Sequence, residues 1–482
     1  MIRYRRRALL SLIMFGCALG AGMAAAVDPP ATEPPPVDTP PTPVAPPAPS
    51  VPEYRFVSMP DFTNADIADL SHLPTWRPEF GNGTSPEWER GLSNVLDAVQ
   101  REGVRDLYVA GDFVEGEWGR DELGTGIFGP VDTRDNRRRA VMRAAGVYYR
   151  AALRRFADHG LALYPAIGDH EIGDNPWGPA YGGYPGFTYR NLGLFKHAYS
   201  RFMMTRPDGT HRFVNRPPGQ ANGTAYAVRP SPNVQLISLD VFRQGMRKGR
   251  RTVLTSIDRP QFDWLDRVLT KANRDGVETI IVQAHTPIIG RIPRRYSSGL
   301  MYEKGTGSPL GRLLRRHRVH LYLAGEGHYV SASRRDGLLQ IAHGGLAKTG
   351  DANYIVVSIG QGTITVEARA FPGSGENPLD GRTLWQTNPL QYSLYADTTY
   401  PRDPVTTGRL VVDTSNGEPT EAIGSLALNR PLPPFTGQQP PRQVTPIDAP
   451  PVGETPADPG APTGSGPDAG APTAPAGSAS GG

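Results

Sequence analysis

The stretch from Leu163 to Asp174 is the most constraining feature of this 482-residue sequence. It reads Leu-Tyr-Pro-Ala-Ile-Gly-Asp-His-Glu-Ile-Gly-Asp, so an apolar run ends in a glycine followed by acidic and imidazole side chains. A short apolar run of this kind predicts a buried strand. Because ligands of open α/β sheets bind at the carboxyl ends of the strands, we expect Asp169, His170 and Glu171 to face a cleft.

Apolar runs elsewhere in the chain also end in side chains that can do chemistry. In chain order these side chains are Asp61, Asp112, His285, Glu326 and His328. Amphipathic patterns separate the runs, as in 86–102, where apolar residues recur at helical spacing. Strands and helices that alternate and then close in a β meander predict an α/β fold. The sheet would be mixed, or two sheets would pack together, with helices outside.

Other segments have simpler patterns. We expect a long helix at 133–159 and a hairpin turn at Gly360-Gln361-Gly362. Segment 187–229 is rich in Gly, Pro and Asn, and is expected to be irregular and to form insertions around a cleft.

The two ends of the chain are unlike the middle. Residues 1–26 have an arginine-rich start, an apolar run and a small-residue end, which predicts a secretory signal cleaved after Ala26. The apolar run is also long enough to span a bilayer, so an uncleaved membrane anchor is the alternative. We therefore expect an exported, periplasmic or extracellular protein. Residues 27–53 are a Pro-rich linker, 373–430 an extension of uncertain structure, and 431–482 a disordered Pro/Gly/Ala-rich tail.

Charge and cysteine content exclude some classes of partner and site. The formal net charge is only +4, and we read the arginines of 133–159 as a solvated helix face, so no nucleic-acid partner is argued. Cys17 is the only cysteine and lies within the predicted signal. A cleaved chain would have neither disulfides nor thiolate ligands, so oxygen and nitrogen atoms must hold any metal. The sequence says nothing about oligomeric state.

The ordered set of acidic and histidine side chains resembles the signature of the calcineurin-like metallophosphoesterases. That signature runs Asp-x-His, Gly-Asp, Gly-Asn-His-Glu/Asp, a lone His and Gly-His-x-His. The matching residues here are Asp61, Gly111-Asp112, Gly168-Asp169-His170-Glu171, His285 and Gly325-Glu326-Gly327-His328. The resemblance assigns residues 54–372 to a phosphoesterase domain. It implies a four-layer αββα sandwich with two mixed β-sheets and a two-metal site at the strand ends.

The same resemblance implies a role for each residue. Asp112 would bridge two cations, the first also held by Asp61 and His328, and the second also held by Asp169, His285 and Glu326. His170 would instead hydrogen-bond the phosphate and protonate the leaving group. Two cations roughly 3.5–4 Å apart polarise a phosphoryl group and activate a water as hydroxide. The implied function is an exported metal-dependent phosphoesterase that hydrolyses a phosphorylated substrate, a phosphate mono- or diester.

The departures from the signature affect the metals. Thr63 replaces a ligand His, Asp169 replaces Asn and Glu326 replaces a His. Carboxylates favour hard cations, so we expect two divalent or trivalent ions, Mn, Fe or Mg, rather than Zn. Purple acid phosphatases, a branch of the family, also lack the first His and use a Tyr three residues after the bridging Asp. Here that position is Glu115, which becomes a candidate extra ligand.

Two alternatives stay open. In a second register, Gly327-His328-Tyr329-Val330 would place His328 on the second metal instead of the first. The departures also permit a catalytically degenerate protein that acts as a ligand-binding or envelope interaction module.

Residues near the expected cleft extend the site. Arg291, Arg294 and Arg295 follow the His285 strand and are candidate substrate-binding residues, although solvated loop charge is the simpler reading. His343 ends another predicted strand, and a structural role is the simpler reading for it.

Overall fold

The computed structural model describes residues 53–61, 66–78, 86–121, 124–173, 185–290, 299–345, 353–371 and 404–431. All of these residues belong to one compact unit, Val51–Gly482. The predicted signal, nearly all of the linker and nearly all of the tail lie outside the described residues. Within the described ranges, every helix is too short or too polar to cross a membrane.

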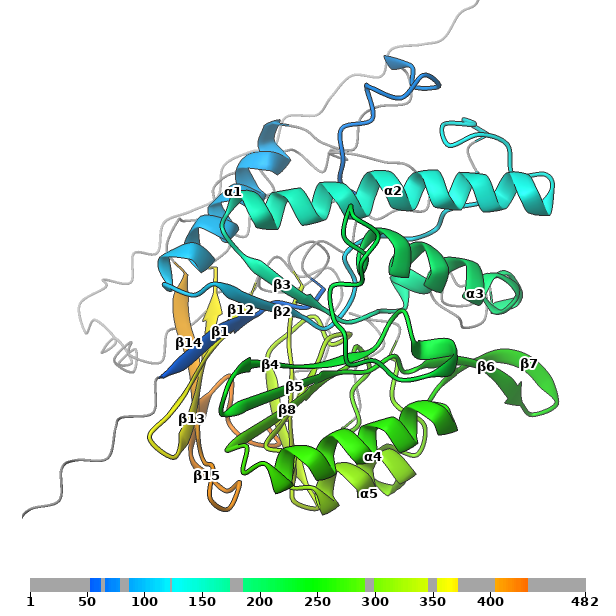
Figure 1. Cartoon of the computed structure of the whole chain (residues 1–482). Helices are drawn as coiled ribbons and strands as arrows, with labels where there is room; N and C mark the ends of the chain where they lie inside the picture. The colour runs from blue at the N-terminus through cyan, green and yellow to red at the C-terminus, as the bar shows by residue number, and fades with distance from the viewer. Residues whose placement is uncertain are drawn as a thin grey trace, which may run out of the picture. The chain divides into compact units, whose positions relative to one another are not determined.

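Two mixed β-sheets form the centre of the fold (Figure 1). The first is seven-stranded, in the order β15 (Pro419–Gly424), β14 (Val405–Asp413), β13 (Thr363–Ala370), β12 (Asn353–Gly360), β1 (Tyr54–Ser58), β2 (Asp106–Val109) and β3 (Ala162–Pro165). The second is six-stranded, in the order β10 (Ser331–Arg335), β11 (Leu338–Ala342), β9 (Leu321–Ala324), β8 (Thr279–Gln283), β5 (Val234–Ser238) and β4 (Tyr226–Ser231). In the first sheet β1, β2 and the edge strand β3 are parallel to one another, and in the second sheet β5, β8, β9 and β11 are parallel.

Helices cover the outer faces of both sheets (Figure 1). Helices α1 (Pro86–Arg101) and α2 (Arg134–Asp158) lie over β1, β2 and β3, and α3 (Pro185–Phe202) packs beside α2. On the other side, α4 (Arg259–Arg274) and α5 (Pro309–Arg316) lie against the second sheet. This arrangement confirms the predicted αββα sandwich.

The sequence explains why these helices form where they do. Helix α1 buries Leu92, Val95, Leu96 and Val99, whose spacing of three and four places them on one face. Helix α2 begins after Thr133, whose side chain accepts a hydrogen bond from the Asn136 N–H at 3.1 Å. Helices α4 and α5 are capped in the same way by Asp258 and Ser308. Local capping and amphipathic patterning therefore agree with the packing.

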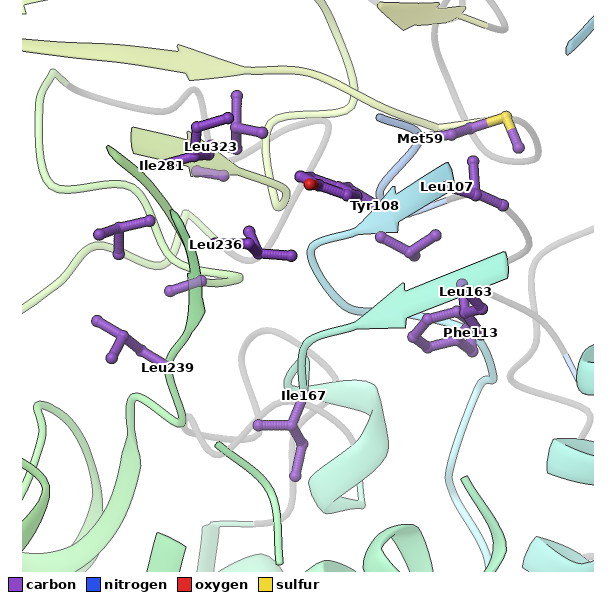
Figure 2. Close-up of a cluster of buried hydrophobic side chains, with 14 of the residues drawn as sticks. Met59, Leu107, Tyr108, Phe113, Leu163, Ile167, Leu236, Leu239, Ile281 and Leu323 are labelled. Carbon is purple, nitrogen blue, oxygen red and sulfur yellow. The ribbon is translucent and has the colours of Figure 1, made fainter. Parts of the chain in front are cut away.

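The main core lies between the two sheets. Figure 2 shows Tyr108 of β2 facing Leu236, Ile281 and Leu323, which come from strands of the second sheet. All four side chains are buried, and the Tyr108 ring stacks on Phe56 with centroids 4.0 Å apart. The sheets are also joined by hydrogen bonds, such as that from Gln283 Nε2 to the Tyr164 carbonyl at 3.0 Å. This packing sets how the two sheets approach each other at the edge that carries the site.

The expectation that 187–229 is irregular is wrong for its first part. Leu192, Phe195, Ala198 and Tyr199 follow helical spacing and are buried in α3, because tertiary packing overcomes the weak helix propensity of Gly and Asn. The hairpin of β6 (Phe242–Arg247) and β7 (Arg250–Thr255) was likewise not anticipated. Its turn is Lys248-Gly249, with both φ angles positive, and a lysine is an uncommon first residue for such a turn.

Part of the segment for which sequence offered no assignment is ordered into the first sheet. Strands β14 and β15, from the predicted extension 373–430, continue that sheet beyond β13. The domain boundaries themselves stay predictions.

The inter-sheet core can be tested with Leu236→Ala. Leu236 is fully buried, so the substitution leaves a cavity and should lower the free energy of unfolding by about 2–5 kcal/mol, measured by urea denaturation. Val214→Ala is the control, because Val214 is 93% exposed and should change stability by less than about 0.5 kcal/mol. Equal effects of the two substitutions would contradict the core described here.

Candidate metal centre

Both sheets present their acidic and histidine residues at one edge. Asp61, Asp112 and Asp169 follow the parallel strands β1, β2 and β3, and His285 and Glu326 follow the parallel strands β8 and β9. Parallel strands end at the same edge of a sheet, so residues far apart in sequence converge. All five side chains are at most 2% exposed, and the neighbouring His328 and His170 are each 6% exposed. The structure thus brings together the residues selected from the sequence.

Two groups of ligand atoms lie within this cluster and share Asp112. The first group is Asp61, Asp112 and His328, and the second is Asp112, Asp169 and His285. Within each group all ligand atoms lie within 4.8 Å of one another. His328 Nε2 is 3.4 Å from Asp61 Oδ1, and His285 Nε2 is 2.9 Å from Asp169 Oδ1 and 3.5 Å from Asp112 Oδ2. Two cations that share one carboxylate fit this arrangement.

The polar atoms of the cluster fit bound cations. Asp61 Oδ2 and His328 Nδ1 are buried and have no hydrogen-bond partner among the described residues. A buried carboxylate oxygen without a partner costs free energy that a cation can offset. The donors are carboxylate oxygens, which suit Mn and Mg, together with imidazole nitrogens, which suit Fe. The predicted pair of metal ions is therefore supported, while their identity stays a prediction.

The electrostatics point the same way. Burial raises the pKa of Asp112 well above its usual value; His285 opposes this shift, whereas Asp169, Asp61 and Glu171 add to it. Burial would lower the pKa of His285, but Asp112, Asp169 and Glu326 raise it well above its usual value. A protonated His285 therefore balances part of the carboxylate charge. A cation that takes over this role releases that proton.

The motif glycines are needed because the site is crowded. A Cβ atom on Gly168 would lie 2.1 Å from Asp112 Oδ1, and one on Gly325 would lie 2.7 Å from Asp61 Oδ2. Both distances are too short for any side chain. Larger residues at these positions would displace the ligands.

The backbone of the ligands is itself strained. Asp61, Asp112, Glu326 and His328 have φ angles of 54°, 63°, 65° and 51°, in the left-handed region that non-glycine residues seldom adopt. Such strain is concentrated at functional sites, where the surrounding structure holds it.

Glu171 holds the backbone at Asp112, the residue that the two groups share. Its Oε2 accepts hydrogen bonds from the N–H groups of Asp112 (2.8 Å) and Gly168 (2.7 Å), and its Oε1 accepts one from Phe113 (2.8 Å). The sequence placed Glu171 at the expected cleft but predicted no role for it. Its position at the end of the Gly-Asp-His-Glu motif is the feature of the sequence that could have indicated one.

Two further histidines near the metal groups, His170 and His343, have different environments. His170 Nδ1 contacts the Glu115 carbonyl oxygen at 2.8 Å, and Nε2 lies 3.9 Å from Asp112 Oδ2. His343 is fully buried, and its Nε2 contacts Ser58 Oγ at 3.0 Å. Burial lowers the pKa of His343 to about 3 despite the opposing charge of Asp61, so this ring is neutral. Of these two histidines, His170 is therefore the one whose Nε2 lies near Asp112, the residue that the two groups share.

Comparisons with known proteins were made for the whole sequence. No protein-family model matches it, and no curated protein matches it. Similar solved structures include a dimetal phosphatase from Danio rerio, with 14% identity over 66% of this chain and 96% of that one and a TM-score of 0.40. A purple acid phosphatase from yellow lupin (Lupinus luteus) seeds matches with 13% identity over 67% and 52% of the two chains, TM-score 0.39. The structure of PhoD matches with 12% identity over 79% and 73%, TM-score 0.45.

The fold assignment does not depend on those distant matches. It rests on the αββα architecture and on the two Asp/His groups at the strand ends. The chain has a calcineurin-like metallophosphoesterase fold.

Within this metallophosphoesterase fold, two predicted ligands stand apart from the paired groups. Glu326 Oε2 lies 3.2 Å from His285 Nε2, while Oε1 accepts a hydrogen bond from the Leu300 N–H at 3.0 Å. Glu115 is buried and belongs to neither group, and its carbonyl oxygen contacts His170. Metal ligation by either residue stays a prediction. Thr63 and the three candidate substrate arginines, Arg291, Arg294 and Arg295, lie outside the described residues.

The shared carboxylate predicts unequal effects on metal binding. Asp112→Asn should weaken both sites, whereas Asp61→Asn should remove about one of two equivalents, since Asp61 belongs to the first group alone. Elemental analysis and Mn²⁺ titration calorimetry of the full chain measure the stoichiometry. Asp263→Asn is the control, because Asp263 forms an exposed ion pair with Arg259 on α4. The same loss of metal in both ligand variants would contradict a bridging role.

Proposed function

We propose that this chain is an exported metal-dependent phosphoesterase that hydrolyses a phosphate mono- or diester. The observation that carries the proposal is the pair of buried Asp/His groups that share Asp112, with His170 beside them. Each group alone would be an ordinary acidic cluster. Two groups sharing a carboxylate match the two-metal arrangement used in phosphoester hydrolysis.

The protein residues would have separate tasks. Bound cations would supply Lewis-acid activation of water and of the phosphoryl oxygens. Asp112 is held by the strained turn after β2 and by Glu171, which accepts its N–H. Burial of the cluster keeps bulk water away and strengthens each electrostatic interaction. The site is thus organised before substrate binds.

His170 is the proposed general acid. A carbonyl oxygen only accepts hydrogen bonds, so the contact with Glu115 places a hydrogen on Nδ1. Nε2 is then the atom that faces the cluster, and it can carry the proton that the leaving oxygen needs. The proton moves from His170 Nε2 to the leaving oxygen as the P–O bond breaks, and water supplies a proton back to the ring.

Two substrates whose leaving groups differ in their need for a proton test this role of His170. His170→Ala should lower kcat by about 10²–10⁴-fold for phenyl phosphate and much less for 4-nitrophenyl phosphate, whose leaving group needs little protonation. Metal content should stay unchanged, because His170 belongs to neither ligand group. His197→Ala is the matched control, since His197 is exposed on α3. An equal loss for both substrates would contradict the acid role, and unchanged rates for both would place the chemistry elsewhere.

Export is proposed from the amino-terminal sequence. The arginine-rich start, apolar run and small-residue end of residues 1–26 support it. Protein recovered from the periplasm or medium should begin at Val27, as read by amino-terminal sequencing. An intact terminus found in the membrane fraction would show the anchored alternative. Full-length protein in the cytoplasm would contradict export.

The degenerate binding module remains the second candidate because three positions depart from the family signature. The metal titration separates the two functions. A chain that takes up no stoichiometric metal under any condition would be the binding module, and the enzyme proposal would fail.

A further inference from the structure

A buried carboxylate outside the metal groups binds the segment that follows Asp112. Asp66 is 2% exposed. Its Oδ1 accepts hydrogen bonds from the N–H groups of Glu115 (3.0 Å) and Gly116 (3.3 Å), and its Oδ2 accepts one from Trp118 Nε1 (2.8 Å). Neither the metal site nor the proposed chemistry uses this residue. These three hydrogen bonds are all donated to it from residues 115–118.

The same segment supports the proposed general acid. The Glu115 carbonyl oxygen contacts His170 Nδ1 at 2.8 Å, and its peptide N–H donates to Asp66. The next residue also touches His170: a Cβ atom on Gly116 would lie 1.8 Å from the His170 carbonyl oxygen. Residues 115 and 116 thus lie directly between Asp66 and His170.

The far end of the segment is anchored in the core. The Trp118 ring stacks on Tyr148 of α2 with centroids 5.7 Å apart and meets Tyr149 edge-on at 5.5 Å. Its indole N–H is the third donor to Asp66. Asp66 therefore joins a backbone turn beside the site to a tryptophan packed under α2.

We propose that Asp66 is a positioning residue: by binding residues 115–118 it sets the Glu115 carbonyl that selects the tautomer and direction of the His170 ring. The inference rests on the proposed function of His170 as general acid. Small displacements of a catalytic group can cost up to about 100-fold in rate, so the effect is measurable.

Asp66→Asn tests the inference with little change in shape. An asparagine keeps one acceptor, but its NH₂ group must then face one of the three donors, so the segment has to move. We expect kcat for phenyl phosphate to fall about 10-fold or more, with little change in KM or metal content. A larger loss for phenyl than for 4-nitrophenyl phosphate would show that the acid step is affected.

A second substitution makes a rescue test. In Asp66→Asn/Trp118→Phe the indole donor is absent, so the amide oxygen can face Glu115 and Gly116 while its NH₂ meets no opposing N–H. The double variant should recover much of the kcat lost in Asp66→Asn. Failure to recover, with Trp118→Phe alone near wild type, would overturn hydrogen-bond positioning by Asp66.

Asp121→Asn is the matched control. Asp121 also accepts backbone hydrogen bonds, from Thr125 (3.0 Å) and Gly126 (2.9 Å), and neither of these two partners belongs to the site. This variant should keep the wild-type kcat. A loss equal to that of Asp66→Asn would show a general loop effect and overturn the inference.

A spectroscopic readout separates this inference from the proposed function. In full-length protein labelled with ¹⁵N-histidine, the signal lost in His170→Ala identifies His170, and its Nδ1 shift reports the Nδ1–H tautomer. Asp66→Asn should alter that shift, and Asp121→Asn should not. An altered shift in a chain without phosphoesterase activity would support the positioning and reject the function. An unchanged shift would overturn the positioning whatever the activity.

Discussion

The carboxylate of Asp112, which the two Asp/His groups share, is the constraint on which the rest of the structure depends. It is buried beside Asp61, Asp169 and Glu171, and these like charges raise its pKa further above the value that burial alone would produce. Protonation of a carboxyl group or the entry of positive charge relieves such a cluster. The raised pKa of His285 favours its protonated form, and cations held by the two Asp/His groups would supply more positive charge. The folded chain therefore offers a buried acidic cluster that bound cations would stabilise.

Placing so many charges together requires a rigid surround. Strands from two sheets end at this edge, and the core around Tyr108 packs the two sheets against each other. Gly168 and Gly325 leave room for ligand oxygens that any side chain would displace. The left-handed backbone at Asp61 and Asp112 is retained because neighbouring hydrogen bonds hold both residues in place. The free energy gained from hydrophobic packing thus offsets the unfavourable free energy of placing these charges together.

Two buried carboxylates support the site, and they differ in how directly they contact the residues that they support. Glu171 lies two residues from Asp169 and orients Asp112 across the strand ends. Asp66 acts over a longer path, through residues 115 and 116 to the ring of His170. Both carboxylates accept backbone N–H groups, yet one borders the metal groups and the other the proposed acid. The two parts of the site meet at Asp112, whose Oδ1 accepts the N–H of His170 at 3.4 Å.

The residues alone predicted an α/β fold with helices outside, most strands and helices, and the order of the acidic and histidine side chains, because apolar runs and helical spacing are local signals. The αββα class was implied by the resemblance of that ordered set to a known family. The sequence patterns misjudged α3, where burial of Phe195 and Tyr199 outweighed local propensity, and they did not single out Asp66. Tertiary structure decided that the ligand atoms of each group around Asp112 lie within 4.8 Å of one another, that His170 is held by a carbonyl oxygen, and that β14 continues the first sheet. These facts depend on contacts between residues distant in sequence, which only the packing of the two sheets brings together.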